Sequence, residues 1–221
     1  MAVKPQQTVG ILGTSGVGKT TLFNLIASNL ELQTGRISID GADQIKGRIS
    51  YMLQKDLLFQ HKSVIENIML PLLIQGYSKK MARLQAKDLL REFDLDKWEN
   101  YYPSALSGGM RQRIAFLRTI SFGRDWLLLD EAFSALDAIT RRQMHRWFHE
   151  VKSKMNWSTL LITHDVEEAL ILCDKIYVLK GQPGEVVLEL DVDLAKEDFE
   201  EFIFASTFLD YKRRLLTALE S

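Results

Sequence analysis

Short apolar runs alternate with longer stretches of helical periodicity along this chain, and the alternation predicts an α/β fold. From about residue 63 to residue 101 the apolar positions recur at helical spacing, which predicts a mostly helical lobe. Residues 199–219 predict one or two amphipathic helices, and the turn residues at 40–41 and 181–184 predict chain reversals. The runs predicted to form strands are residues 8–12, 36–39, 49–53, 126–129, 158–163, 175–179 and 185–190.

The composition is that of a folded protein of one domain, or of one domain with an added lobe. The 221 residues are 46% hydrophobic, and 28 basic against 29 acidic residues leave a net charge of −1. No strong field therefore draws the chain to nucleic acid or to anionic lipid. Cys173 is the single cysteine, which excludes an internal disulfide and fits a reducing compartment. The first residues do not predict a signal peptide, and no apolar stretch approaches the ~20 residues of a membrane span.

A glycine-rich loop follows the first predicted strand and precedes a predicted helix, and it matches the phosphate-binding pattern G-x-x-x-x-G-K-[ST]. Glycines let backbone N–H groups close around phosphate oxygens, and the positive end of the helix points at the same anion. The lysine adds charge for the β- and γ-phosphates, and the final hydroxyl supplies a magnesium ligand. The sequence therefore predicts nucleotide binding at Gly13, Thr14, Ser15, Gly16, Val17, Gly18, Lys19 and Thr20.

Two carboxylates, Asp130 and Glu131, follow the apolar run at residues 126–129. In a phosphate-binding sheet an acid at such a strand end reaches the magnesium shell. Glu131 would then stand beside the γ-phosphate, where it could polarise an attacking water. Without the glycine-rich loop, the simpler interpretation would be two solvated acids after a strand. The loop upstream favours the functional interpretation.

A second glycine pair occurs in residues 106–110, which read LSGGM. Ser107 can cap a helix, and Gly108 and Gly109 leave backbone N–H groups open to an anion. Physical reasoning alone favours a simple helix N-cap here. The segment, however, resembles the signature sequence of the ATP-binding subunits of ABC transporters, which is among the more specific short motifs.

Other motifs of that family occur in the expected order. Gln54 matches the Q-loop glutamine, residues 134–137 match the D-loop that ends at Asp137, and His164 matches the switch histidine. A lone Gln, Asp or His would more often be structural, but six ordered motifs leave little room for chance. The resemblance extends from Thr8 to the C-terminal helices. Residues 136–141, 163–169 and 181–184 resemble the corresponding segments of one importer group, which transports nitrate, taurine, aliphatic sulfonates and thiamine-precursor pyrimidines.

The resemblance implies an ABC ATPase fold with a P-loop core lobe at residues 1–62 and 122–221. It implies an inserted helical lobe at 63–121 and a β-subdomain that is incomplete at the N-terminus. Two copies would pair head to tail, with each ATP between residues 13–21 of one copy, Thr21 included, and residues 107–109 of the other. Asp137 would link the two sites across the dimer.

The resemblance also implies a role for each residue that faces the γ-phosphate. Glu131 would act as general base, and His164 would contact the γ-phosphate and hold the closed geometry. Lys19 would stabilise charge on the transferring phosphoryl group. The residues expected to hold magnesium are Thr20, Gln54 and Asp130.

The implied partners are a second copy of the chain, a transmembrane permease and, indirectly, a solute-binding protein, with no nucleic acid. The chain would lie on the cytoplasmic face of the cell membrane, held there by the permease. Residues 55–62 stand where the family docks a helix of its membrane subunit, with Phe59 and His61 as candidates for the groove. An equally good interpretation of Phe59 is an apolar anchor for the helical lobe.

Two departures from the family pattern bear on function. Ala132 stands where proline usually follows the glutamate, from which we expect only a looser turn. No aromatic residue precedes Phe23, so the usual stacking partner for adenine is missing, which predicts weak binding with little discrimination between ATP and GTP. Two alternatives to an importer ATPase stay open: a soluble ABC ATPase of repair or translation, and a catalytically impaired regulatory subunit. The intact Glu131 and His164 argue against the second.

Overall fold

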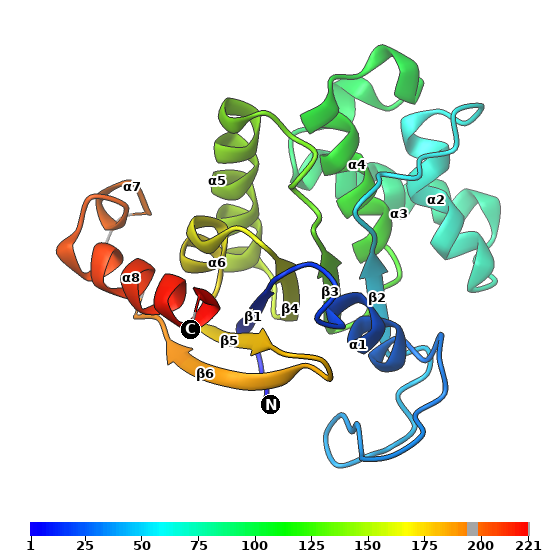
Figure 1. Cartoon of the computed structure of the whole chain (residues 1–221). Coiled ribbons are helices and arrows are strands. Elements are labelled where there is room, and N and C mark those ends of the chain that lie inside the picture. The colour runs from blue at the N-terminus through cyan, green and yellow to red at the C-terminus, as the bar shows by residue number, and fades with distance from the viewer. Residues whose placement is uncertain (194–198, 221) are drawn as a thin grey trace.

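A mixed sheet of six strands forms the centre of the computed structural model, which describes residues 1–193 and 199–220. The strand order is β2-β3-β4-β1-β5-β6, and all neighbours are parallel except the antiparallel pair β5–β6 (Figure 1). Because β1 to β4 run the same way, the loops that follow them meet at one edge of the sheet. The strands are β1 (Thr8–Gly13), β2 (Ile49–Met52), β3 (Trp126–Asp130), β4 (Ser158–Thr163), β5 (Lys175–Lys180) and β6 (Glu185–Asp191).

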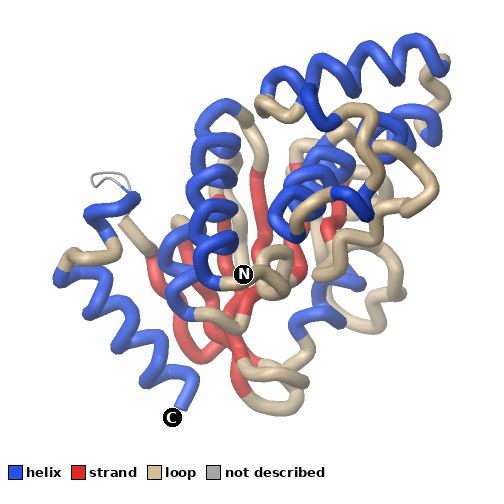
Figure 2. The backbone as a smooth tube through the Cα atoms, turned by 90° about the horizontal axis from the view of Figure 1, so that it is seen from above, coloured by secondary structure: helices blue, strands red, loops and turns tan. Residues whose placement is uncertain are grey.

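Helices cover both faces of the sheet, as the view from above shows (Figure 2). Alternate residues of a strand point to opposite faces, so Leu128 packs on the side of Phe23, whereas Leu127 and Leu129 pack on the side of the larger helical core. The helices are α1 (Lys19–Ile26), α2 (Val64–Ile74), α3 (Lys79–Glu92), α4 (Gly108–Ile120), α5 (Ala138–Lys154), α6 (Val166–Leu172), α7 (Phe199–Phe202) and α8 (Ser206–Glu220), with short 3-10 turns at Asp96–Trp98 and Pro103–Ala105.

The helix α2 contacts both α3 and α4, and the three lie together at one side of the molecule, beyond the edge strand β2 (Figure 1). Their starts are well defined by sequence: Ser63 and Glu66 form a capping box at α2, and Ser78 caps α3. The helix α8 packs on α6 and β5 at the opposite side. The Q-loop glutamine, which follows β2, therefore lies at the border between the sheet and the α2–α4 group.

Six of the seven predicted strands and the C-terminal helices are confirmed, with ends that shift by at most two residues. The predicted strand at residues 36–39 is wrong. Ile39 forms one isolated bridge to Ala42 across the turn at Asp40, and in the described part of the chain no strand lies beside this segment. An apolar alternation this short buries too little surface to form a strand without a neighbouring strand to pair with. Positions 194–198 and 221, which belong to the predicted core lobe, lie outside the described residues.

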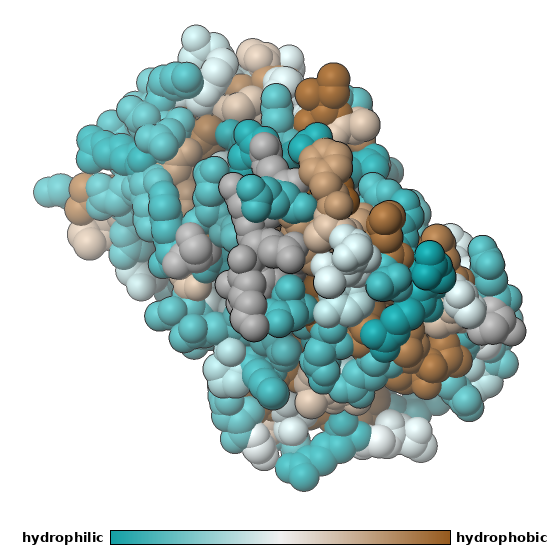
Figure 3. Space-filling model, turned by 90° about the vertical axis from the view of Figure 1, so that its left-hand side faces the viewer, coloured by the Kyte–Doolittle hydropathy of each residue, from teal (hydrophilic) through white to brown (hydrophobic). Residues whose placement is uncertain are grey.

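Within the described residues, no helix combines the length and the apolar character that crossing a membrane requires. The face at the left of Figure 1, which carries α7 and α8, is mainly hydrophilic, with hydrophobic atoms gathered toward one side (Figure 3). Exposed apolar residues of this region include Phe204 and Leu209, which are 80% and 58% exposed.

Candidate functional site

The glycine-rich loop joins β1 to α1 and leaves the start of the helix open. The residue before the helix, Gly18, has φ +102°, a left-handed conformation that glycine adopts without strain. At Gly13 a Cβ atom would lie 2.6 Å from the carbonyl oxygen of Leu179, so no larger residue fits. No side chain caps α1. The first backbone N–H groups of the helix are thus left for an anion.

Lys19 lies inside this loop and is 6% exposed. Its Nζ donates hydrogen bonds to the carbonyl oxygens of Gly13 at 2.7 Å and Thr14 at 2.9 Å. Burial lowers the pKa of Lys19, and the negative charges of Glu131 and Asp130 oppose that shift. The loop therefore holds a buried cation beside two acids.

The first of these acids, Asp130, ends β3 and is 7% exposed. The hydroxyl of Tyr51 donates a hydrogen bond of 2.9 Å to its Oδ2. Burial raises the pKa of Asp130, and Glu131 adds to the rise, whereas the Tyr51 hydrogen bond and the charge of Lys19 lower it. Burial and the charge of Asp130 also raise the pKa of Tyr51, so its hydroxyl keeps its proton and stays a donor.

The second acid, Glu131, meets two side chains that the sequence placed far away. The Nε2 of Gln54 donates to Oε2 of Glu131 at 3.2 Å, and Nδ1 of His164 lies 3.3 Å from the same oxygen. The Nε2 of Gln54 also donates to Oγ of Ser134 at 3.2 Å. Glu131 itself has φ +46°, a conformation that costs a residue with a side chain some strain and that clusters at functional sites.

All three predicted metal ligands line one cavity. A hollow of about 320 Å³ is bordered by Thr20, Gln54, Asp130 and Glu131. A hydroxyl, an amide and a carboxylate are oxygen donors of the kind that magnesium accepts, and magnesium usually takes its other ligands from phosphates and water. Among the described residues no group of three His, Cys, Asp or Glu side chains is arranged to hold a metal by itself. The donors present thus fit magnesium bound together with a phosphate ligand.

The predicted signature residues lie elsewhere. Ser107 caps α4 by accepting a hydrogen bond of 3.3 Å from the N–H of Met110. Ser107 and Gly109 border a separate hollow of about 180 Å³, together with Thr140 of α5. Asp137 caps α5, and hydrogen bonds from Thr140 lower its pKa. Neither the signature segment nor Asp137 borders the 320 Å³ cavity that Asp130 and Glu131 line, which we call the cavity of the acids.

An arginine that the sequence showed only as part of a family motif organises the segment after Glu131. Arg141 donates to the carbonyl oxygens of Phe133, Ser134 and Leu136 at 3.3, 3.1 and 2.8 Å. Its Nη1 lies 3.5 Å from Oδ2 of Asp165, the residue after His164. The side chain of Arg141 therefore joins the D-loop to the residues that follow β4, which include His164.

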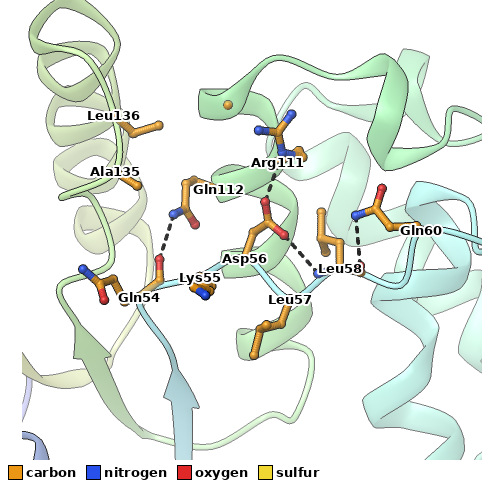
Figure 4. A pocket seen from close by; sticks show the side chains of 11 residues that line it. Gln54, Lys55, Asp56, Leu57, Leu58, Gln60, Arg111, Gln112, Ala135 and Leu136 are labelled. Atoms are coloured by element: carbon orange, nitrogen blue, oxygen red, sulfur yellow. Dashed lines mark hydrogen bonds and ion pairs between the residues drawn. The ribbon is translucent and has the colours of Figure 1, made fainter.

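The Q-loop is tied to α4 in a similar way (Figure 4). The Nε of Arg111 donates to Oδ2 of Asp56 at 3.0 Å, and Nε2 of Gln112 donates to the carbonyl oxygen of Gln54 at 3.3 Å. Arg118 donates to the carbonyl oxygens of Asp56 and Leu57 at 2.6 and 2.7 Å. Gln54, Asp56, Leu57, Arg111 and Gln112 border a larger pocket of about 590 Å³. Sequence reasoning missed these contacts because the partners are more than 50 positions apart.

Tyr51 was also missed, although a signal for it existed. A tyrosine within the apolar run at residues 49–53 carries a hydroxyl that needs a partner when the strand is buried. The nearest polar group on a neighbouring strand depends on strand order, and the sequence does not state that order.

A strand, a phosphate-binding loop and a helix, with an acid pair at the end of another parallel strand of the same sheet, define a P-loop nucleotide-binding site. Comparison with protein families matches residues 1–134 to the family described as ABC transporter. The chain belongs to the ABC transporter family, as an ATP-binding subunit with ATPase activity, and the predicted α/β fold of this class is confirmed.

Relatives of known type agree with this assignment. The formylaminopyrimidine import ATP-binding protein ThiZ of Halalkalibacterium halodurans is 43% identical over 186 residues, which cover 84% of this chain and 73% of ThiZ. The taurine import ATP-binding protein TauB of Rhizobium johnstonii is 41% identical over 187 residues, covering 84% and 71%. The solved dimer of the ATP-binding cassette MJ0796 with ADP and Pi is 26% identical in sequence and superposes with a TM-score of 0.73. The match covers 87% of this chain and 88% of the MJ0796 chain.

Proposed function

We propose that ATP hydrolysis at the cavity of the acids energises the import of a small solute. The observation that carries the proposal is the meeting of Lys19, Gln54, Asp130, Glu131 and His164 at one edge of the sheet. They come from four separate segments of the chain, and together they would supply a cation, a metal ligand set, a base and a γ-phosphate contact. The names of the relatives, which are import ATP-binding proteins, support the transport direction.

The chain's own residues divide the work of hydrolysis. Backbone N–H groups of the loop at residues 13–18 and of the first turn of α1, including Thr21, would bind the phosphates. Lys19 would exchange its two carbonyl partners for phosphate oxygens and stabilise charge in the transition state. The residues that would hold magnesium are Thr20, Gln54 and Asp130, and the ion, when bound, would neutralise charge on the phosphates.

Glu131 would accept the proton of the attacking water. Its Oε2 is engaged by Gln54 and His164. We propose that Gln54 turns to the metal and His164 to the γ-phosphate when nucleotide binds. That rearrangement would free Oε2 of Glu131 to act as base.

A second copy of the chain would complete each site. Residues 107–109 and Asp137 do not border the cavity of their own chain, and Asp137 is exposed. The solved relative MJ0796 is a dimer. We propose that the signature N–H groups of one copy bind the γ-phosphate on the other, and that Asp137 connects the two sites.

The Q-loop segment, residues 55–62, would receive the permease. It would lie where the core lobe, residues 1–62 and 122–221, joins the helical lobe, residues 63–121. Phe59 is 48% exposed and contacts the ring of His61, which favours a docking role over that of a buried anchor of the helical lobe. Arg111 and Arg118 tie the segment to α4, the helix that the signature residues begin. A movement at Gln54 would therefore reach both the docking segment and the signature residues. The permease would hold the chain at the cytoplasmic face of the membrane, and a solute-binding protein would deliver the substrate.

Phosphate release by the purified chain with magnesium and ATP tests the catalytic half of the proposal. Lys19→Ala should reduce the rate by a factor on the order of 100 or more, because a charge that stabilises the transition state is removed. Lys4→Ala, at an exposed position outside the loop, is the matched control and should leave the rate unchanged. Equal rates in the parent and in Lys19→Ala would overturn the assignment.

Attachment to membranes that contain the permease tests the transport half. Phe59→Ala should release the chain from such membranes while leaving ATP binding intact, because the docking surface lies outside the nucleotide site. Phe204→Ala removes another exposed aromatic ring and should not release it. If the two variants behave alike, residues 55–62 are not the docking surface.

A further inference from the structure

The hydroxyl of Tyr51 is directed at one oxygen of the acid that ends β3. It donates 2.9 Å to Oδ2 of Asp130. Within the described residues the other oxygen, Oδ1, accepts no hydrogen bond from the protein, and Asp130 borders the cavity that Thr20 and Gln54 share. One carboxylate oxygen is therefore occupied by the phenol and the other is left for a ligand.

The sheet dictates this contact through its register. Tyr51 of β2 is the direct partner of Leu128 of β3. Side chains two positions apart on a strand share a face, so Asp130 is the diagonal neighbour of Tyr51 on the face that also carries α1. A diagonal neighbour lies within reach of a long aromatic side chain.

The ring of Tyr51 is itself held in place. It packs edge-on against Phe23 of α1, with ring centroids 6.0 Å apart, and Phe23 is fully buried. The helix α1 begins at Lys19 and carries Thr20 in its first turn. Tyr51 thus contacts the helix of the phosphate loop on one side and the acid of the neighbouring strand on the other, three residues before Gln54.

We propose that Tyr51 is a positioning residue that holds Asp130 with Oδ1 turned to the cavity, and that it thereby sets how tightly the site takes magnesium with a nucleotide. The inference rests on the proposed function, in which Asp130 is a magnesium ligand. Hydrogen bonds to ligating carboxylates orient them, and losing such a bond typically costs about 10- to 100-fold in metal affinity. Without the phenol, a buried carboxylate would turn between orientations, and fewer of them would suit the metal.

The substitution Tyr51→Phe tests the proposal, because it keeps the ring against Phe23 and removes only the hydroxyl. Binding of the non-hydrolysable analogue AMP-PNP is measured by calorimetry over a magnesium series and again in EDTA. We expect the half-saturating magnesium concentration to rise about 10-fold, with no change of affinity in EDTA. In steady-state hydrolysis the rate should recover at high magnesium, which separates weakened metal binding from lost catalysis.

A matched control comes from the same face of the sheet. Tyr177 of β5 belongs to the same apolar cluster. Its hydroxyl accepts a hydrogen bond of 3.1 Å from the N–H of Ala2 and donates one of 3.5 Å to Glu189, away from Asp130 and Glu131. Tyr177→Phe likewise removes one buried hydroxyl and keeps the ring, and it should leave the half-saturating magnesium concentration unchanged. An equal rise of the half-saturating magnesium concentration in both variants would mean that losing either tyrosine hydroxyl loosens the sheet, and the positioning role would be refuted.

The remaining outcomes separate the inference from the function on which it rests. If AMP-PNP binds the parent equally well in magnesium and in EDTA, the proposed magnesium site itself is wrong. If the parent requires magnesium and Tyr51→Phe has the same half-saturating concentration, only the role of Tyr51 is wrong. If Tyr51→Phe weakens binding in EDTA as much as in magnesium, the residue supports the fold rather than the metal ligand, and the proposal fails.

Discussion

The side-chain amide of Gln54 donates to Oε2 of Glu131 across 3.2 Å, although 77 positions separate the two residues. The same oxygen lies 3.3 Å from Nδ1 of His164. The carboxylate that would act as base is thus occupied by two residues that would respond to the γ-phosphate. Both neighbours would therefore have to turn away before this oxygen could accept a proton.

Glu131→Gln should keep ATP binding and lose turnover by about 100- to 10,000-fold, because the general base is removed and the phosphate loop is intact. An ATP-bound dimer should accumulate, and size-exclusion chromatography with ATP would detect it. Glu167→Gln alters an exposed acid that pairs with Lys212 on the surface and serves as the control. Near-parental hydrolysis by Glu131→Gln would remove the residue from the mechanism.

Ser107→Arg should abolish hydrolysis while each copy still folds and binds nucleotide, because the bulky cation would block closure on the partner's ATP. Lys19→Ala should be inactive for a different reason, the loss of charge at its own site. Mixing the two inactive variants should restore part of the activity, since a mixed dimer has one site with both defects and one site with none.

Crosslinking across the intact interface controls this mixing experiment by verifying that mixed dimers form. If mixed dimers form and every mixture stays inactive at single-turnover ATP, the arrangement of Ser107 across the dimer is contradicted. Mixing Ser107→Arg with itself provides the baseline.

Gly109→Ala should destabilise the fold by about 1–3 kcal/mol, the usual cost of overpacking. A Cβ at this position would lie 2.5 Å from Cγ2 of Thr140, whose β-branched side chain is stiff in a helix. At Gly108 the nearest atom, on Leu136, would be 3.6 Å away, so Gly108→Ala is a matched control with little expected cost.

Thr140→Ser should rescue Gly109→Ala, because it removes the clashing methyl and keeps the hydroxyl that hydrogen-bonds Asp137. Urea unfolding of the two single variants and the double variant measures the coupling directly. Additive effects, with no rescue, would show that the contact between α4 and α5 is not what limits the residue at position 109.

Cys173 should resist thiol reagents in the native protein, because full burial raises the pKa of its thiol well above the ordinary value of about 9. Labelling at pH 8 should follow the unfolding rate and become rapid in urea. A folded pKa above the unfolded one favours the neutral thiol, so its contribution to stability is present below about pH 9 and declines above it. Rapid labelling of the folded chain would contradict the burial.

Much of the fold and most of the candidate site could be predicted from the sequence, because the signals are local. The loop at residues 13–20 states its own chemistry, and apolar runs that end in a turn, a glycine or an acid mark the strand ends. The exception, residues 36–39, had the local alternation of a strand but no partner strand in the described part of the chain. A strand depends on its neighbour, and that dependence is not local.

The sequence by itself determined which chemical groups this protein carries and in what order: a phosphate loop, a glutamine, a signature segment, an acid pair and a histidine. Only the tertiary structure decided which of them meet. Parallel strands in the order β2-β3-β4-β1 bring Gln54, Glu131 and His164 to one edge, and the register of β2 on β3 directs Tyr51 at Asp130. The physical reason is that side-chain direction alternates along each strand, so a partner across the sheet is set by strand order and register, neither of which any local run of residues contains.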